Sequence, residues 1–199
     1  MGMIEDGTGS GLRAQVNSKN RLVTETVTFD REDDAISSGV GYQLTSGPVS
    51  YTVAGAGIAH GVFYMKNVED VDVVLDRVVL MISTATGATG DWSHRIIRNP
   101  TGGTLISNAV PGGISNSNHG SANVLNGGTD IYKGIEGDTL TGGTGVPLPV
   151  QVQSNRILFP IGRRIPKNSS FAVEITPPLG TTAAISVTVC HVFVDTNQL

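Results

Sequence analysis

The sequence is poor in cysteine, in charge and in aromatic residues. Cys190 is the one cysteine among 199 residues, so no disulfide can form within the chain and no oxidising compartment is indicated. Charged residues make up 15% of the chain, against roughly 25% in an average globular protein. Few charged residues are therefore available for the solvent-exposed faces of helices. The formal net charge of -4 argues against a protein that binds nucleic acid by neutralising its phosphates.

Long apolar runs are missing as well. Asp or Arg interrupts the hydrophobic stretches, which fall short of the ~20 residues that a membrane-spanning helix needs. Residues 1–20 lack the apolar block of a signal peptide. We therefore expect a protein that is made in a cytoplasm, with neither membrane nor nucleic acid among its partners.

Glycine, threonine, serine and asparagine are abundant instead. The 26 glycines are nearly twice the usual share of about 7%, and these residue types are typical of turns and strand surfaces. Valine is dense over 68–82, where its β-branched side chain favours a strand over an amphipathic helix. The composition predicts an all-β protein.

Alternation of apolar and polar residues predicts the strands, because a period of two suits a half-buried strand. Strands are predicted at 22–29, 61–66, 72–83, 157–161, 171–176 and 185–194, with two short strands around the Ser46-Gly47-Pro48 turn. These strands and the lack of a confident helix indicate a single antiparallel β-sandwich, most simply a jelly roll.

The same alternation predicts which side chains of the last strands face the core. The residues expected to point inward are Phe171, Val173, Ile175, Val187, Val189, His191 and Phe193. Glycine- and asparagine-rich stretches between 84 and 149 predict long loops or short exposed strands, where specificity can reside. The acidic segment 30–39 is interpreted as a solvated loop.

Residues 1–20 are expected to form an extended arm ahead of a sandwich domain at 21–199. Three glycines precede a short alternation from Leu12 to Val16, which predicts a brief strand. Glycines make a free arm costly to order without a partner. We therefore expect the arm to dock on a neighbouring chain, using the candidate partner-binding residues Leu12, Arg13, Ala14, Val16 and Arg21.

No catalytic constellation is recognisable. The four histidines, His60, His94, His119 and His191, are far apart in sequence and form no zinc-binding pair. No glycine run has the form of a phosphate-binding loop, and no serine occupies a nucleophile elbow. The acidic residues Asp30, Glu32, Asp33 and Asp34 are an alternative calcium site but lack the spacing of an EF-hand loop. We expect no catalytic residue, no cofactor and no metal.

Two further groups of residues are candidate contacts. A positive cluster of Arg163, Arg164 and Lys167 follows the strand "RILFPIG" and is a candidate docking edge for an acidic partner, with ordinary surface solubility as the alternative. The second group are possible loop contacts, namely Trp92, His94, Arg95 and Tyr132.

Three segments together resemble small β-sandwich virion proteins of tailed bacteriophages. They are "DGTGSGLRAQVNSKNRLVT", the pair "GVFYMKN" and "VDVVLDRVVLMI", and "SNRILFPIGRRIPKNSSFAVEITPP". The stretches "NPTGGTLIS" and "NSNHGSANVL" are also similar to this group. The resemblance covers most of the chain in style and order, and implies a structural virion component such as a capsid decoration (cement) protein. It carries over no catalytic residue.

Three functional hypotheses follow. The leading one is a non-enzymatic virion protein that binds the capsid lattice as a homo-oligomer, most plausibly a trimer, with the major capsid protein or another virion protein as its partner. The second is a tail-associated receptor- or carbohydrate-binding module that uses Trp92, Tyr132 and the polar loops. The third, a cupin-like enzyme, needs a His and Glu cluster that is not found.

Overall fold

The structure is a computed structural model of the 199-residue chain. It describes residues 3–5, 13–16, 22–23, 31–52, 57–83, 91–125, 130–148, 156–179 and 184–194. The chain forms two compact units, Met1–Asp30 and Arg31–Leu199.

The smaller unit contains a three-stranded antiparallel sheet in the order β1-β2-β3. Its strands are β1 (Met3–Glu5), β2 (Arg13–Val16) and β3 (Leu22–Val23). The alternation that predicted a brief strand near residues 12–16 corresponds to β2, so this prediction is confirmed. The strand predicted at 22–29 begins as β3, and residues 24–29 lie outside the described residues.

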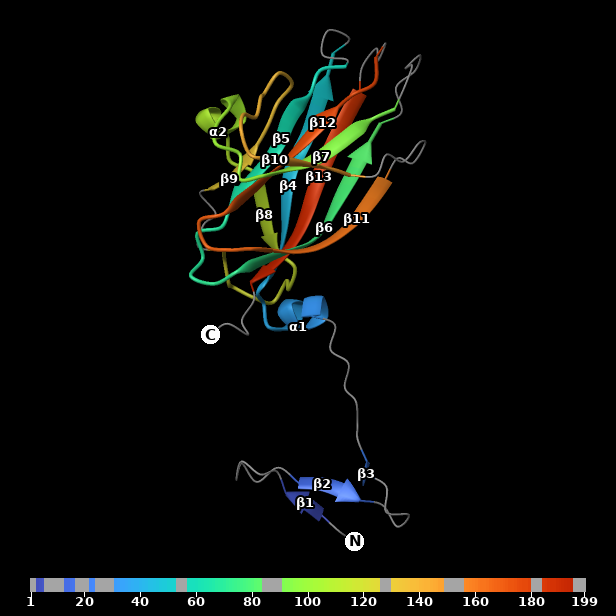
Figure 1. The fold of residues 1–199 in the computed structure, drawn as a ribbon, viewed down its shortest axis with the longest axis vertical. Helices are drawn as coiled ribbons and strands as arrows, with labels where there is room; N and C mark the ends of the chain where they lie inside the picture. Colours follow the sequence, from blue (N-terminus) through green and yellow to red (C-terminus); the bar gives the residue numbers. More distant parts are fainter. Residues whose placement is uncertain are drawn as a thin grey trace. The chain divides into compact units, whose positions relative to one another are not determined.

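The larger unit is built from strands, and its described residues also include two short helices, α1 and α2 (Figure 1). In chain order its elements are α1 (Arg31–Ser37), β4 (Gly41–Tyr51), β5 (His60–Lys66), β6 (Val73–Ile82), β7 (Ser93–Arg98), α2 (Thr104–Asn108), β8 (Gly113–Asn116), β9 (Ile131–Lys133), β10 (Thr144–Pro147), β11 (Arg156–Ile165), β12 (Ser170–Thr176) and β13 (Ala184–Val194).

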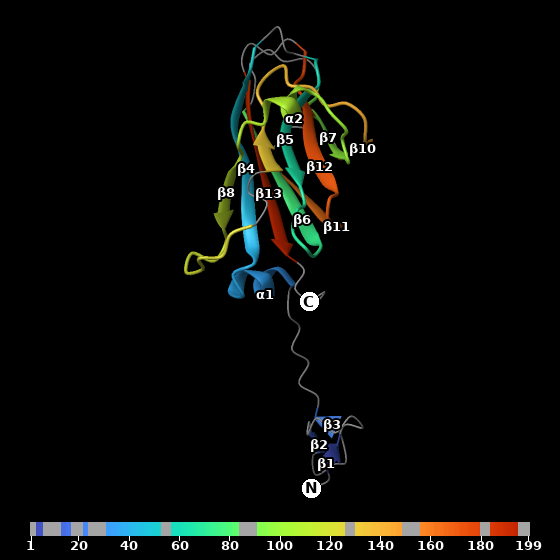
Figure 2. The same ribbon diagram turned by 90° about the vertical axis from the view of Figure 1, so that its left-hand side faces the viewer.

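The pairing of the strands defines the topology. β4 pairs with β13, β5 with β12, β6 with β11 and β7 with β10, and every one of these pairings is antiparallel. A long hairpin that pairs in this nested way and then rolls up gives two sheets that pack face to face. In this structure the strand orders are β10-β7-β12-β5-β9 and β11-β6-β13-β4-β8 (Figure 2). This arrangement is the jelly roll, so the predicted all-β antiparallel sandwich is confirmed.

The main core lies between the two sheets. Its largest fully buried side chains include Leu44, Phe63 and Leu80. Phe171, Val173 and Ile175 belong to the same cluster, which confirms that β12 presents this face inward.

Each helix covers part of the outer face of one sheet. Leu105 of α2 packs with Tyr64, Ile97 and Ala172, which point away from the main core. Ala35 of α1 forms a smaller cluster with Val74 and Phe193 on the other sheet. The packing of α2 on the sheet that contains β5 and β12 explains why these two strands are buried on both faces.

The acidic segment is not the solvated loop that was predicted, because residues 31–37 form α1. Glu32 reaches back to the guanidinium of Arg77 on β6, and Ala35 is buried against the sheet. The sequence pattern missed this helix because it is short and has a single small apolar contact rather than an amphipathic stripe.

The turn predicted at Ser46-Gly47-Pro48 is also wrong, because β4 continues through it as one strand. Between Thr45 and Pro48 the strand carries one residue more than β13 does, so the irregularity is a β-bulge. Gly47 has φ +64, which a glycine adopts readily, and the backbone N–H of Thr188 donates to Ser46 Oγ at 3.0 Å.

The inward face of β13 is the opposite of the predicted one. Its side chains in the main core or fully buried beside it are Ala184, Ser186, Thr188, Cys190 and Val192, whereas Val187, Val189 and His191 are half-buried on the outer face. Ser186 is tolerated inside because its Oγ shares a 2.7 Å hydrogen bond with the hydroxyl of Tyr51. Phe193 is buried as predicted, but beneath α1 rather than between the sheets.

Candidate functional site

A cleft of about 70 Å³ opens between β11 of one sheet and the ends of β7 and β12 of the other. We call it the arginine cleft, since Arg98, Arg163 and Arg164 all line it. The remaining lining residues are Leu75, Ile96, Asn99, Ile161, Ile165, Pro166, Ser169, Ser170 and Phe171. The cleft therefore combines an apolar interior with cationic side chains.

A β-bulge in β11 places two of these arginines. Pro160 lies opposite Arg77 and Arg163 lies opposite Leu75, so β11 carries one residue more than β6 across this interval. Gly162 within the bulge has φ +59, the left-handed conformation that glycine supplies in one class of bulge. A bulge of this kind changes the direction of the side chains that follow it. The sequence had indicated that Arg163 and Arg164 follow the strand. In the structure both residues lie within β11.

A buried asparagine fixes the far end of β11. Asn67 follows β5, and its Nδ2 donates to the carbonyl oxygen of Ile165 at 2.7 Å and to that of Val71 at 3.0 Å. The Oδ1 atom of Asn67 accepts from the backbone N–H of Glu69 at 2.9 Å. One side chain therefore joins the β5–β6 connection to the wall of the cleft.

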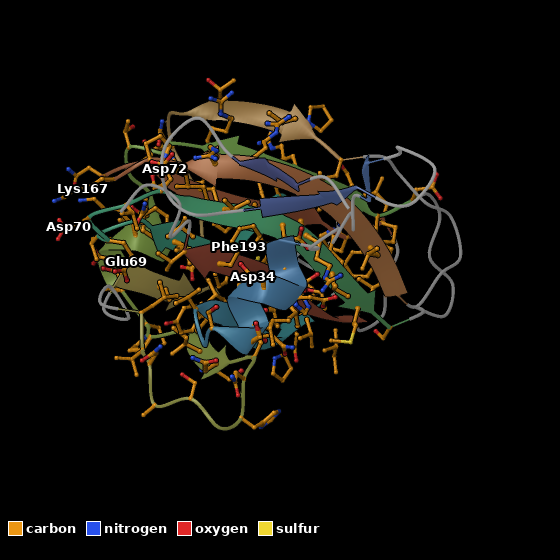
Figure 3. All side chains as sticks on the ribbon, turned by 90° about the horizontal axis from the view of Figure 1, so that it is seen from below. Asp34, Glu69, Asp70, Asp72, Lys167 and Phe193 are labelled. Atoms are coloured by element: carbon orange, nitrogen blue, oxygen red, sulfur yellow. The ribbon has the colours of Figure 1, made fainter. Side chains whose placement is uncertain are left out.

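The charged groups around the cleft are not equally compensated. Arg164 lies 3.5 Å from Asp72, and Lys167 donates a hydrogen bond to Asp70 at 2.6 Å. The hydrogen bond from Lys167 and, to a smaller extent, its positive charge hold the pKa of the Asp70 carboxyl below its usual range. Figure 3 shows Lys167 and Asp70 side by side. Lys167 does not line the cleft. The structure therefore brings together Arg163 and Arg164 of the predicted cluster and leaves Lys167 outside it.

Arg98 is the cleft residue that sequence reasoning missed. It ends β7, and only the pairing of β7 with β12, in which Arg98 lies opposite Phe171, brings it to the cleft. Within the described residues, neither Arg98 nor Arg163 forms an ion pair. No sequence signal connects two positions so far apart in the chain.

Trp92 and His94 lie in the core and not on an exposed loop as predicted. Trp92 is 9% exposed and His94 is 2% exposed. Their rings stack at 6.4 Å, and Tyr51 meets Trp92 edge-on at 5.7 Å. The physical reason is the alternation that begins at Trp92, just before β7, and continues along the strand, so that Trp92, His94 and Ile96 are all buried. Burial lowers the pKa of His94 to about 4.

The other two predicted loop contacts lie on strands. Arg95 is half-exposed on β7 and forms an ion pair with Glu174 of the neighbouring strand β12. Tyr132 on β9 stacks on Tyr64 with ring centroids 5.4 Å apart, and its hydroxyl donates to Asp130 Oδ1 at 3.1 Å. Both side chains are engaged within the fold.

Three of the five candidate residues of the arm lie in the small sheet. Arg13, Ala14 and Val16 are on β2, which is the middle strand of the three. Leu12 and Arg21 lie outside the described residues.

The alternative calcium site falls on α1, where Glu32, Asp33 and Asp34 form the first turn, and Asp30 lies outside the described residues. Across the described part of the chain, no three His, Cys, Asp or Glu side chains gather in a way that could hold a metal ion. Neither of the described helices has the length and hydrophobicity to cross a membrane.

A second surface is the apolar face, which we define by the exposed side chains of Met81, Leu158 and Ile185. These are 38%, 50% and 45% exposed. Met81 lies opposite Val187, and Leu158 lies opposite Val79, which in turn lies opposite Val189 on β13. The three residues therefore mark a continuous apolar strip on the outer side of the sheet that contains β11, β6 and β13, beyond the part that α1 covers.

No protein-family model and no curated protein sequence matches the chain. Among solved structures, one described as "Structure of deformed wing virus carrying the GFP gene" is similar over 86% of this chain and 88% of that chain, with 11% sequence identity and a TM-score of 0.30. The assignment of the fold rests on the strand pairing and not on this likeness.

Proposed function

We propose that the chain is a non-enzymatic structural protein of a virion, and specifically a bacteriophage capsid decoration (cement) protein that binds the capsid lattice as a homo-oligomer, namely a trimer. In this role the sandwich is the rigid body of the protein. The small N-terminal sheet and the apolar face are the surfaces that attach it to its partners. The resemblance in the sequence to tailed-phage virion proteins supports the same role.

The N-terminal sheet is the observation that carries the proposal. Its strands have three, four and two residues, and a unit of this size buries too little apolar surface to be stable alone. Within the described residues, β1 and β3 each pair only with β2, so each leaves one edge with unpaired backbone groups. Such an edge is suited to strand addition by another chain.

The apolar face supports the same conclusion. Contiguous exposed apolar surface on a monomer is typical of an interaction site. By contrast, α2 covers the outward side chains of Tyr64, Ile97 and Ala172, and α1 covers those of Val74 and Phe193. A subunit whose surface is largely contact also needs few charges, in keeping with the 15% of charged residues.

The alternative of a carbohydrate-binding tail module receives no comparable support. It depended on Trp92 and Tyr132 as stacking surfaces for sugar rings. Trp92 is buried and Tyr132 is stacked on Tyr64.

The test is reconstitution of purified particles that lack the protein. The full chain is expected to co-sediment with the particles in many copies and to raise their resistance to heat. A variant without residues 1–30 is expected to keep the melting temperature of the sandwich, since Arg31–Leu199 has its own core, but to be retained far less well. Light scattering of the free protein reports its oligomeric state.

Failure of the full chain to bind any particle, or presence of only a handful of copies on each, would contradict the decoration role. If the variant without residues 1–30 bound as tightly as the full chain, the small sheet would not be the attachment surface.

A further inference from the structure

We propose that the arginine cleft binds an extended acidic segment of another protein by taking one branched aliphatic side chain whose neighbouring residues carry carboxylates. The inference goes beyond the proposed function and does not depend on it.

The interior of the cleft suits an aliphatic side chain. Leu75, Ile96 and Phe171 line it and belong to the buried core, so the cleft reaches down to the hydrophobic layer between the sheets. Its volume of about 70 Å³ is roughly half of an engineered apolar cavity of about 150 Å³ that holds benzene. A side chain of the size of valine or leucine matches this space, whereas an aromatic ring exceeds it.

The rim of the cleft suits carboxylates. Arg98 comes from one sheet and Arg163 from the other, and both side chains belong to exposed residues without an ion pair in the described part of the chain. Arg164 is directed to Asp72 instead. Planar guanidinium groups accept carboxylates in a bidentate geometry, so the two arginines recognise acidic residues on either side of the inserted side chain.

The backbone of β11 supports an extended partner rather than a small anion. β11 ends its sheet and, among the described residues, pairs with β6 alone. A peptide can add to such an edge through main-chain hydrogen bonds while alternate side chains enter pockets. The two arginines, the apolar interior of the cleft and the free edge of β11 together specify one class of ligand, an acidic peptide with an aliphatic residue at its centre.

The probe is an N-acetylated peptide amide of sequence Gly-Glu-Leu-Asp-Gly, titrated into the full chain and followed by isothermal titration calorimetry at low ionic strength. Two matched peptides separate the contributions: one carries Gln and Asn in place of the acids, and the other carries Gly in place of Leu. Each is expected to bind at least about fivefold more weakly than the parent. Added salt is expected to weaken the parent and to leave the uncharged peptide unchanged.

Variants of the protein identify the cleft as the site. Arg98→Gln and Arg163→Gln are each expected to lower the affinity about three- to fivefold, in keeping with the modest strength of exposed ion pairs, and the double variant is expected to lower it about tenfold or more. Lys133→Gln is the matched control, since it removes one exposed positive charge on β9, an edge strand that is separated from β12 by β5 and does not line the cleft. Melting temperatures verify that each variant is folded.

Any one of four results would overturn the proposal. The parent peptide fails to bind the folded protein, or the Gly-substituted peptide binds as well as the parent, or Lys133→Gln weakens binding as much as Arg163→Gln does. Displacement of the peptide by inorganic phosphate at an equal concentration would assign the cleft to simple anions and would overturn it as well.

Discussion

His94 is a histidine held inside the sandwich, where its ring stacks on Trp92 and the core surrounds it. Burial disfavours the charged imidazolium, and so the pKa of His94 falls to about 4, below the value of about 6.5 for a histidine in water. An unfolded chain therefore takes up a proton at this residue at a higher pH than the folded chain does.

This difference makes stability depend on pH in a definite direction. Because the folded pKa is the lower one, the stability is fully present above about pH 6.5 and declines as the pH falls towards 4, by up to about 3 kcal/mol. Urea unfolding between pH 4 and pH 8 measures the decline. His94→Phe is expected to flatten this part of the profile, and His119→Gln, a change at an exposed residue, is expected to leave it intact. Parallel profiles for the wild type and His94→Phe would contradict the assignment.

Cys190 is the second residue whose chemistry is set by burial. It is fully buried on the inward face of β13, and burial raises the pKa of its thiol well above the usual range. The thiolate is the reactive form, so we expect no reaction with a thiol reagent in the native state and complete reaction after denaturation. Rapid labelling of the folded protein would show that β13 opens locally.

At the scale of elements, β13 tests the assignment of its two faces. Val192 lies in the main core and Val187 is half-buried on the outer face. Val192→Ala is therefore expected to lower the free energy of unfolding by about 2 kcal/mol, and Val187→Ala by less than about 1 kcal/mol. Chemical denaturation of the pair measures this, and equal losses would mean that the face remains misassigned.

The sequence predicted that β13 is a strand but not which side faces inward. Both sets of alternating side chains are largely apolar, and the set that was rejected includes Ser186 and Thr188. Long-range interactions decide which face is buried, namely the hydrogen bond between the hydroxyls of Tyr51 and Ser186 and the pairing of β13 with β4. Neither interaction is visible in the local pattern. β12 was predicted correctly because its outward positions, Ser170, Ala172, Glu174 and Thr176, carry small or polar residues, whereas the three inward positions carry large apolar residues.

The candidate site was predictable to the same limited extent. Arg163 and Arg164 were recognised because they are adjacent in the sequence and follow a clear strand. Arg98 was not recognised because its position depends on strand register. Trp92 and His94 were misplaced because the region of β7 was predicted as a long loop or a short exposed strand and not as a buried strand. Local patterns identify strands, whereas sites between two sheets depend on the pairing of distant strands.

For the whole molecule, we expect that stability does not depend on metal. Glu32 pairs with Arg77, and across the described residues no group of acidic or histidine side chains is placed to hold an ion. Addition of EDTA is expected to leave the melting temperature unchanged, as measured by differential scanning calorimetry. A decrease that calcium restores would point to the acidic residues of α1.

The nested pairing of the jelly roll has a consequence for how the protein is made. β4 is the first strand of the roll, and its partner β13 is the last, with Gly41 lying opposite Phe193. On the ribosome, the edge of β4 that pairs with β13 therefore stays unpaired until nearly the whole roll has been synthesised, although its other edge can pair with β8 earlier. The non-local pairing with β13 makes folding slow. Until then the nascent chain must stay soluble, either through its own glycine-rich connections or through a chaperone that the cell supplies.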